Sequence, residues 1–321
     1  MTLSRRHLFH STAALAALNA GMAAAHAAAP LSKTQAPGFY RYMVGELELT
    51  AVHDGFYSRP LDGLVTNAPL KTVEDGAAAM LMPTDRLVIP FTTTVVNTGS
   101  RLVVIDTGNG NSGAVTSGQW MTNFRAAGFT PEQVDTVILS HFHGDHINGL
   151  RLKDGTAVFP GAEIMVPAAE WAYWMDDAKM ASAPDGLKGA FGNVRRVFGP
   201  MANDVKQYTP DRELVTGLTA IAAPGHTPGH TAFAVTSGAG RLLLLSDTTN
   251  HPALFARNPE WSGVFDIDPE MARTTRRRML ELAVAERMQV AFYHAPFPAT
   301  GYLTRSGSGF EFLPKAWSST V

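Results

Sequence analysis

The chain has 321 residues, of which 45% are hydrophobic and 17% are charged, a composition typical of a globular protein. Its formal net charge is −2. The composition therefore does not indicate a basic surface that would bind nucleic acid. The sequence contains no cysteine, which excludes disulfides, thiolate metal ligands and thiol nucleophiles.

The first 27 residues have the composition of an export signal. Arg5 and Arg6 are the only charged residues of this segment, and an apolar, alanine-rich stretch follows from Leu8. Ala25-His26-Ala27 then provides a cleavage site of small residues. We therefore expect residues 1–27 to be a signal peptide that is removed from the mature protein.

The segment Ser4-Arg5-Arg6-His7-Leu8-Phe9 resembles the twin-arginine motif of export signals. A membrane anchor is the alternative, but the apolar run is short and is broken by Asn19 and His26. We therefore expect a periplasmic protein, exported by the twin-arginine route and without a stable membrane anchor. Residues 28–321 are expected to form a single domain, in which 24 of the 26 basic residues remain against 28 acidic ones, a net charge of −4.

After about residue 37 the hydrophobic pattern alternates between strands and helices, which is typical of a layered α/β domain. Several apolar strands end directly before a polar residue of the kind that binds metals. In chain order, we expect strands at 93–97 and 102–105, a helix at 119–127, a strand at 136–139, a short helix after Pro167, a strand at 242–245, a helix from Asp268 to about 288 and a strand at 290–293.

The strongest functional signal is the motif His141-Phe142-His143-Gly144-Asp145-His146, directly after a predicted strand. Alternate side chains of extended backbone point the same way, so His141 and His143 can bind one metal ion. Gly144 allows a tight turn, which lets Asp145 and His146 face a second position. Imidazole nitrogens and carboxylate oxygens are ligands that Zn²⁺ and similar ions accept.

Three further candidate ligands lie later in the chain. His226 lies in a loop whose flanking Pro and Gly residues aim the imidazole by fixing the backbone. Asp247 follows an apolar strand, where a carboxylate is costly unless it is paired or binds metal, and its two oxygens can bridge two ions. His294 ends the last predicted strand. A single histidine of this kind is usually structural, but the ordered series is rarely met by chance.

This ordered series resembles the five motifs of the metallo-β-lactamase superfamily, and the resemblance covers nearly all of the chain from about Gly45. The family's motifs match Asp106, the 141–146 cluster, His226, Asp247 and His294. The resemblance implies a four-layer αβ/βα sandwich of the α/β class, with metal ions at one edge of its two sheets.

The resemblance also implies two divalent metal ions, most simply Zn²⁺, and a division of the ligands between them. His141, His143 and His226 would hold the first ion, and Asp247 would bridge both. The second ion would be held by Asp145, His146 and His294.

Two more residues are expected to support the ligands. Asp106, in Val103-Val104-Ile105-Asp106-Thr107-Gly108, corresponds to a family residue that supports the metal loop by hydrogen bonds and is not a ligand. His230 lies four residues after His226 and is either a support of the ligands or a structural residue.

The chemistry implied by the resemblance is hydrolysis. Two ions share and acidify one water, and the bridging hydroxide attacks the substrate, so no nucleophilic side chain is needed. The sequence has no G-x-S-x-G motif. By analogy with the family, Asp145 also transfers a proton to the leaving group. Within the superfamily the chain is most similar to methyl parathion hydrolases and dinuclear lactonases, over residues 93–99, 140–150, 245–247 and 294–302.

Similarity to this branch implies a small-molecule substrate. Trp171 and Phe191 resemble positions that line an aromatic leaving-group pocket in the phosphotriesterase branch, and core packing is the alternative for both. The stretch 181–190, rich in small residues, is a candidate lid. The loop 109–113 lacks the phenylalanine that the phosphotriesterase branch has there. We therefore expect a lactone or an aryl ester to be favoured over a phosphotriester.

Two other functions share part of this pattern. A thioester hydrolase similar to glyoxalase II has the same ligand set, but export would separate it from cytosolic glutathione. A non-hydrolytic di-iron redox protein carries a glutamate at the position of His143. The sequence leaves open the substrate, the native metal and the oligomeric state, a homodimer included.

Overall fold

The computed structural model describes residue 29 and residues 31–321, of which Pro37–Val321 form one compact unit. The expected signal peptide, residues 1–27, lies outside the described residues, so its boundary stays a prediction. Within the described part of the chain, no helix has both the length and the apolar character that crossing a membrane requires.

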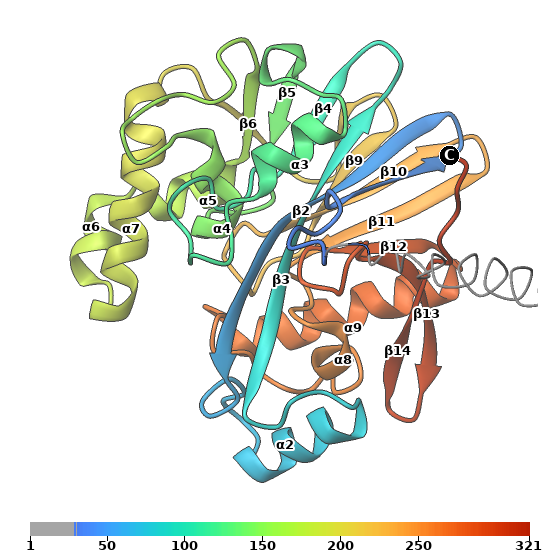
Figure 1. Cartoon of the computed structure of the whole chain (residues 1–321). Helices are drawn as coiled ribbons and strands as arrows, with labels where there is room; N and C mark the ends of the chain where they lie inside the picture. The colour runs from blue at the N-terminus through green and yellow to red at the C-terminus, as the bar shows by residue number, and fades with distance from the viewer. Residues whose placement is uncertain (1–28, 30) are drawn as a thin grey trace, which may run out of the picture. The chain divides into compact units, whose positions relative to one another are not determined.

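The first half of the unit forms a seven-stranded sheet in which neighbours in sequence are neighbours in space (Figure 1). The first four strands are antiparallel, and the fourth to seventh run parallel to one another. The strands are β1 (Phe39–Val44), β2 (Leu47–Pro60), β3 (Arg86–Asn97), β4 (Leu102–Ile105), β5 (Thr136–Ile138), β6 (Glu163–Pro167) and β7 (Lys206–Tyr208).

The second half forms another seven-stranded sheet, in the order β14-β13-β12-β11-β10-β9-β8. Neighbouring strands are antiparallel except β11 and β12, which are parallel and are connected through helical segments. The strands are β8 (Glu213–Val215), β9 (Leu218–Ala222), β10 (Thr231–Ser237), β11 (Gly240–Ser246), β12 (Gln289–Phe292), β13 (Thr300–Ser306) and β14 (Gly309–Pro314).

The connections contain eight α-helices and three short 3₁₀ helices among the described residues. The α-helices are α2 (Leu70–Ala79), α3 (Trp120–Ala126), α4 (Gly144–Ile147), α5 (Ala168–Trp174), α6 (Asp177–Ser182), α7 (Asp185–Phe198), α8 (Pro252–Phe255) and α9 (Pro269–Ala285). The 3₁₀ helices are η1 (Pro131–Gln133), η2 (Asn148–Leu150) and η3 (Gly199–Met201).

The two sheets pack face to face through one apolar core. Val96 of β3 points into it from the first sheet, and Leu242 and Leu244 of β11 point into it from the second. Their sequence neighbours Val95 and Leu243 belong to separate cores on the outer faces. Because successive side chains of a strand face opposite sides, a continuous apolar strand is what a sheet buried on both faces requires.

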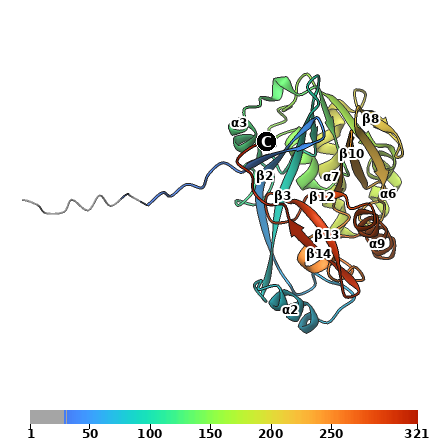
Figure 2. The ribbon, with the colours of Figure 1, turned by 90° about the vertical axis from the view of Figure 1, so that its right-hand side faces the viewer.

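Helices cover the outer face of each sheet. Phe124 of α3, Trp174 of α5 and Phe191 of α7 pack against the first sheet. Leu280 of α9 packs against the second sheet, and Figure 2 shows α9 on its outer side. The layers are therefore helix, sheet, sheet, helix, which confirms the predicted αβ/βα sandwich.

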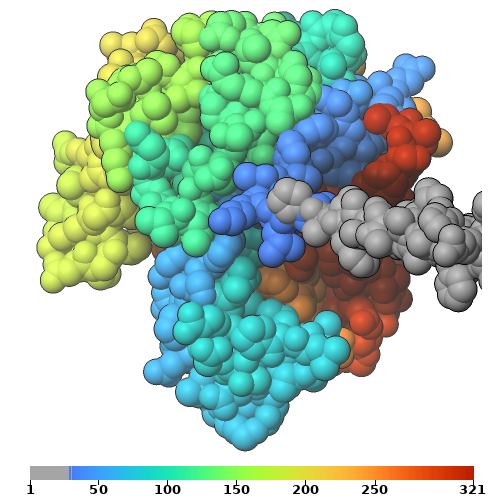
Figure 3. All heavy atoms as spheres, in the orientation of Figure 1, coloured from blue at the N-terminus to red at the C-terminus, as the bar shows by residue number. Residues whose placement is uncertain are grey.

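The far ends of β2 and β3 continue beyond the sheet, because β4 pairs only with residues 94–97 of β3. Val73 and Ala77 of α2 pack on this extension together with Ile89 of β3 and Leu254 of α8. Figure 3 shows the segment that contains α2 as a lobe at the lower end of the unit. The extension forms a wall beside the sheet edge at which β4, β5 and β11 end.

The elements expected from the sequence are present, with different ends. The predicted strand pair at 93–97 and 102–105 is confirmed as β3 and β4, although β3 already begins at Arg86. The Asp268 side chain accepts a hydrogen bond from the Met271 amide at 3.0 Å and caps α9 as expected. The candidate lid at 181–190 contains the end of α6 and the first turns of α7.

Replacing Phe191 tests its place in the structure. The Phe191 ring is fully buried and lies 4.7 Å from the Trp174 ring, centroid to centroid. We expect Phe191→Ala to lower the free energy of unfolding by about 3–5 kcal/mol, because it leaves a cavity in the core. Urea unfolding monitored by circular dichroism measures this. Leu187→Ala, at a half-buried position of the same helix, is the control and should cost clearly less, and equal small losses would contradict a core role.

Candidate metal centre

The ends of strands from both sheets bring the predicted ligands together. The 141–146 segment follows β5, and α4 begins inside it at Gly144. His226 lies in the loop between β9 and β10, Asp247 directly follows β11, and His294 lies two residues after the end of β12. Four connections that are far apart in sequence thus meet at one edge of the sandwich.

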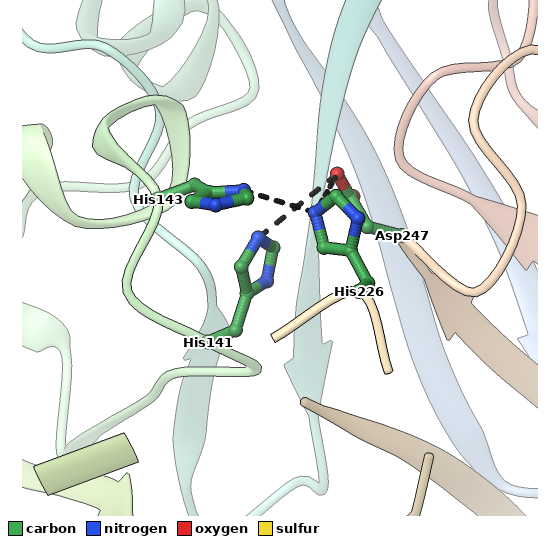
Figure 4. A group of neighbouring side chains, drawn as sticks. All are labelled: His141, His143, His226 and Asp247. Atoms are coloured by element: carbon green, nitrogen blue, oxygen red, sulfur yellow. Dashed lines mark hydrogen bonds and ion pairs between the residues drawn. The ribbon is translucent and has the colours of Figure 1, made fainter. Parts of the chain in front are cut away.

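The first group of ligands consists of His141, His143, His226 and Asp247, whose ligand atoms all lie within 4.8 Å of one another (Figure 4). The Nε2 atom of His226 lies 2.9 Å from Nδ1 of His143 and 3.3 Å from Oδ2 of Asp247. The Nε2 atom of His141 lies 4.0 Å from the same carboxylate oxygen. These donors surround one position that an ion can occupy.

The second group consists of Asp145, His146 and His294, again with ligand atoms within 4.8 Å of one another. Oδ2 of Asp145 lies 3.5 Å from Nε2 of His146 and 3.7 Å from Nε2 of His294. All three predicted ligands of a second ion are therefore adjacent.

Asp247 contacts both groups. Its Oδ1 lies 3.3 Å from Nε2 of His146, and its Oδ2 lies 2.9 Å from Nε2 of His294 and 3.3 Å from Nε2 of His226. Burial alone would raise the pKa of Asp247, but His294 and His146 hold that pKa well below its usual value. The carboxylate is therefore ionised and placed between the two groups.

The donor set fits metal ions. Nε2 of His141, Nε2 of His146 and Oδ1 of Asp247 are buried and have no hydrogen-bond partner among the described residues. Leaving buried polar atoms unpartnered is costly, and one metal ion in each ligand group would supply the missing partners. Burial also lowers the pKa of His141 well below its usual value, which keeps the imidazole in the neutral form that binds metals.

Hydrogen bonds outside the ligand groups fix which nitrogen each histidine presents. Nδ1 of His146 and of His226 each faces a carboxylate, and Nδ1 of His294 faces a backbone carbonyl. An ionised carboxylate or a carbonyl can only accept a hydrogen bond, so in these three histidines Nδ1 must carry the proton. The Ser140 hydroxyl donates to Asp106 at 2.7 Å and therefore accepts from Nδ1 of His141. In all four histidines the Nε2 lone pair faces the ligand groups. The partners of Nδ1 are Ser140 Oγ for His141 at 3.0 Å, Asp106 Oδ2 for His146 at 2.8 Å, Asp266 Oδ1 for His226 at 2.9 Å and the Pro90 carbonyl for His294 at 2.9 Å.

Asp106 lies outside both groups and supports them, as the sequence predicted. Its Oδ2 accepts from Nδ1 of His146, and its Oδ1 accepts from the backbone amide of Ser140 at 2.8 Å. Asp106 therefore connects the end of β4 to both ends of the 141–146 segment. Its backbone has φ = 60°, a conformation that non-glycine residues adopt mostly when a local role requires it.

His230 supports the backbone of Asp247. Its Nε2 accepts a hydrogen bond from the Asp247 amide at 3.0 Å, and its Nδ1 donates to the Ala223 carbonyl at 2.9 Å. Burial, with His226 nearby, lowers the pKa of His230 to about 3, so the ring is neutral and can keep both hydrogen bonds. The sequence left open whether His230 supports the ligands or is only structural, and its hydrogen bond to the Asp247 amide favours the supporting role.

Asp266 and Arg276 were missed by sequence reasoning. Asp266 orients His226 and receives a charged contact of 3.3 Å from Nη2 of Arg276. The Arg276 side chain is buried and also donates to three backbone carbonyls. An arginine within the run 276–278 of a helix is typical of a solvated face, but the loop before α9 folds over this side of the helix and buries Arg276.

Glu170 was also missed, and it joins two ligand loops. Its Oε2 accepts from the Phe142 amide at 3.0 Å and from the Trp174 indole at 2.9 Å, and its Oε1 accepts from the Gly229 amide at 2.6 Å. The side chain is fully buried. Nothing in a surface-type Ala-Ala-Glu sequence indicates this role, because the donors come from loops that are distant in sequence.

A cavity of about 280 Å³ opens over the ligands. Its walls combine aromatic and aliphatic residues of β2, β3 and the loop before α9 with three asparagines, and they contain no lysine and no arginine. The lining residues are Tyr57, Ile89, Phe91, Asn109, Ala114, His143, Gly144, Asp145, Asn148, His226, Asp247, Asn250, Phe265 and His294.

Trp171 and Phe191 do not line this cavity, which corrects the substrate-binding role predicted for them. Phe191 is fully buried between α5 and α7. Trp171 is partly buried and packs edge-on against Phe142 and Phe198, with centroid distances of 6.5 and 5.8 Å. The aromatic side chains at the cavity come instead from β2, β3 and residue 265, so the alternative of core packing holds for both predicted residues.

The fold and the two ligand groups define a metal-binding αβ/βα sandwich protein. The chain belongs to the metallo-beta-lactamase superfamily, whose family model matches residues 90–288, and the predicted family is thereby confirmed.

Two curated relatives show where similarity is concentrated. The chain is 26% identical over 171 residues to an N-acyl homoserine lactonase of a Bacillus species, which covers 53% of this chain and 59% of the relative. It is 29% identical over 168 residues to the N-acyl homoserine lactonase AttM of Agrobacterium fabrum, covering 48% of this chain and 59% of the relative. The matches thus span less than two thirds of these relatives' length.

Two solved structures resemble nearly the whole unit. AidC, a dizinc quorum-quenching lactonase in complex with a product, has a TM-score of 0.83 and 24% identity, over 88% of this chain and 99% of AidC. The hydrolase AbOPH has a TM-score of 0.83 and 26% identity, over 89% of this chain and all (100%) of AbOPH. The likeness to AidC establishes the shared fold, and the curated relatives, both N-acyl homoserine lactonases, agree with the predicted similarity to lactonases.

Removing the shared carboxylate tests the two-ion arrangement. The wild-type protein should hold about two equivalents of divalent metal per chain. Asp247→Ala should lower the occupancy of both sites, because the carboxylate contacts both ligand groups. Elemental analysis of protein purified without chelator measures the content. His230→Ala is the matched control: it removes only a support and should keep most of the metal. Equal loss from both variants would contradict this division.

Proposed function

We propose that this protein is an exported dinuclear metal hydrolase that cleaves lactones or aryl esters, with Zn²⁺ as the metal. The observation that carries the proposal is the Asp247 carboxylate, which contacts both complete ligand groups at the floor of a cavity. When bound, two divalent ions supply an activated water and positive charge beside the oxygen under attack. The names of the relatives support the lactone as substrate class.

Asp145 is the residue proposed to handle the proton. Its Oδ2 faces His146 and His294, so Oδ1 remains for the leaving oxygen of the substrate. Its side chain is 22% exposed and lines the cavity. Burial opposes its charge, but His146 and His294 lower its pKa to about 2. Asp145 is therefore ionised at neutral pH, which is the state that accepts a proton and passes it to the leaving group.

The walls of the cavity favour an uncharged substrate. The lining offers aromatic rings and asparagine amides, and none of the lining residues is a lysine or an arginine. A lactone or an aryl ester needs no cationic partner. A glutathione thioester carries carboxylates that would lie unpaired in such a cavity, so the thioester alternative is less well supported.

Phosphotriester hydrolysis is the second candidate, and one observation favours it. Tyr57, Phe91 and Phe265 provide aromatic surface at the cavity, which can hold an aromatic leaving group. The loop at 109–113 contains no aromatic residue. Of residues 109–114, only Asn109 and Ala114 line the cavity. A tetrahedral phosphotriester is bulkier than a planar ester and needs its leaving group held in line.

The substrate class is tested with one metal-loaded preparation. We expect kcat/KM for dihydrocoumarin and for phenyl acetate to exceed that for methyl paraoxon. One missing stacking partner is worth about 0.5–1.5 kcal/mol, roughly threefold to tenfold in rate. Ala114→Phe should narrow the gap, because residue 114 lines the cavity. Ser112→Phe, which does not line it, is the control. A clear preference of the wild type for the phosphotriester would overturn the assignment.

Periplasmic location is part of the proposal and has its own test. Replacing both Arg5 and Arg6 by lysine keeps the charge but removes the twin-arginine motif. We expect the periplasmic yield to fall strongly, with precursor retained in the cytoplasm, as measured by fractionation and immunoblotting. Lys33→Arg, beyond the predicted cleavage site, should have no effect. An unchanged yield of the double variant would rule out the twin-arginine route.

A further inference from the structure

Asn148 is a buried amide at the edge of the ligand groups that the hydrolytic machinery does not use. It follows α4 directly and lines the cavity, with 7% of its surface exposed. Its Oδ1 accepts from Nδ2 of Asn193 at 2.9 Å and from Nη2 of Arg196 at 2.8 Å. Both partners lie on α7, so this helix holds the amide from behind.

These partners fix the orientation of the amide. Amide oxygen and nitrogen are often hard to tell apart, but a guanidinium group can only donate. The atom that faces Arg196 must therefore be the oxygen, and the NH₂ group must face the other way. Nδ2 makes no hydrogen bond to the described residues, so the Asn148 donor remains available to a ligand.

The free donor lies beside the two ligand groups. A Cβ atom placed on Gly144 would lie 3.0 Å from Nδ2 of Asn148. Gly144 stands between His143, a member of the first group, and Asp145, a member of the second. A substrate whose reacting carbonyl lies between these groups therefore brings its neighbouring atoms within reach of Asn148.

The other two asparagines of the cavity differ in what they offer. Asn109 donates from Nδ2 to Asp54 at 2.9 Å, so its oxygen is the free end of the amide. Asn250 accepts from the His251 amide at 2.9 Å, and no side chain among the described residues donates a hydrogen bond to it. Of the three asparagines, Asn148 thus offers the cavity an NH₂ group whose orientation is fixed by Asn193 and Arg196 behind it.

We propose that Asn148 determines substrate specificity by donating a hydrogen bond from Nδ2 to a carbonyl oxygen that the substrate carries next to the bond being cleaved. This inference rests on the proposed hydrolysis of lactones. It assigns the part of the cavity wall formed by Asn148, which α7 holds in place, to the recognition of an acylamino substituent or a similar neutral acceptor. The metal ligands then set the reaction, and Asn148 sets which lactone is preferred.

The test compares two lactones that differ in the acceptor: 2-acetamido-γ-butyrolactone and 2-propyl-γ-butyrolactone. Asn148→Asp keeps an oxygen toward Asn193 and Arg196 but removes the donor, and Asn148→Ala removes the whole amide. Asn250→Asp is the matched control, because it brings the same charge to the same cavity. Metal content is measured for every variant, and kcat/KM is measured for both lactones.

We expect the ratio of kcat/KM, acetamido over propyl, to fall about two- to tenfold in both Asn148 variants, which is the range for one hydrogen bond. The ratio should stay unchanged in Asn250→Asp. An unchanged ratio in the Asn148 variants, or an equal fall in Asn250→Asp, overturns the inference while lactone hydrolysis stands. If the metal-loaded wild type hydrolyses neither lactone, the proposed function fails, and the inference fails with it.

Discussion

Both oxygens of one buried carboxylate, that of Asp247, face histidines from the two groups of ligands. A carboxylate at this depth is unfavourable unless positive charge surrounds it. His294 and His146 lie next to the carboxylate, and they outweigh the effect of burial on the pKa of Asp247. Metal ions held by these ligands would add positive charge at the same place. The histidines and the carboxylate therefore stabilise one another at this edge of the sandwich.

The face-to-face sheets make this arrangement possible. β5 and β4 end at the same edge as β11 and β12, so side chains from both sheets meet without long flexible segments. Buried carboxylates behind the ligands then fix the loops: Asp106 joins β4 to the 141–146 segment, Asp266 orients His226, and Glu170 ties Phe142 to Gly229. Because each of these carboxylates accepts from several donors, the ligand atoms are positioned before any ion binds.

The sequence predicted the ligands and the layers well because those signals are local. A strand followed by a ligand residue, or an apolar strand buried on both faces, is visible within a few residues. Asp266, Arg276 and Glu170 were not assigned, because their partners come from distant loops and give no local pattern. Trp171 and Phe191 were placed at the substrate by resemblance, whereas contacts between α5 and α7 bury them in the core. Periodicity describes which face is apolar but does not say whether that face meets a core or a ligand.

The residues that position the metal ligands are different from the residues that shape the substrate cavity. The ligand groups and the carboxylates behind them are fixed by contacts within and between the two sheets. The cavity walls depend on other segments: Asp54 of β2 holds Asn109, and Arg196 of α7 holds Asn148. α7 lies in the connection between β6 and β7 and contributes no ligand. Sequence changes in this connection can therefore alter the orientation of a hydrogen-bond donor at the substrate without disturbing the ligand atoms, which is how one metal centre can serve substrates of different shape.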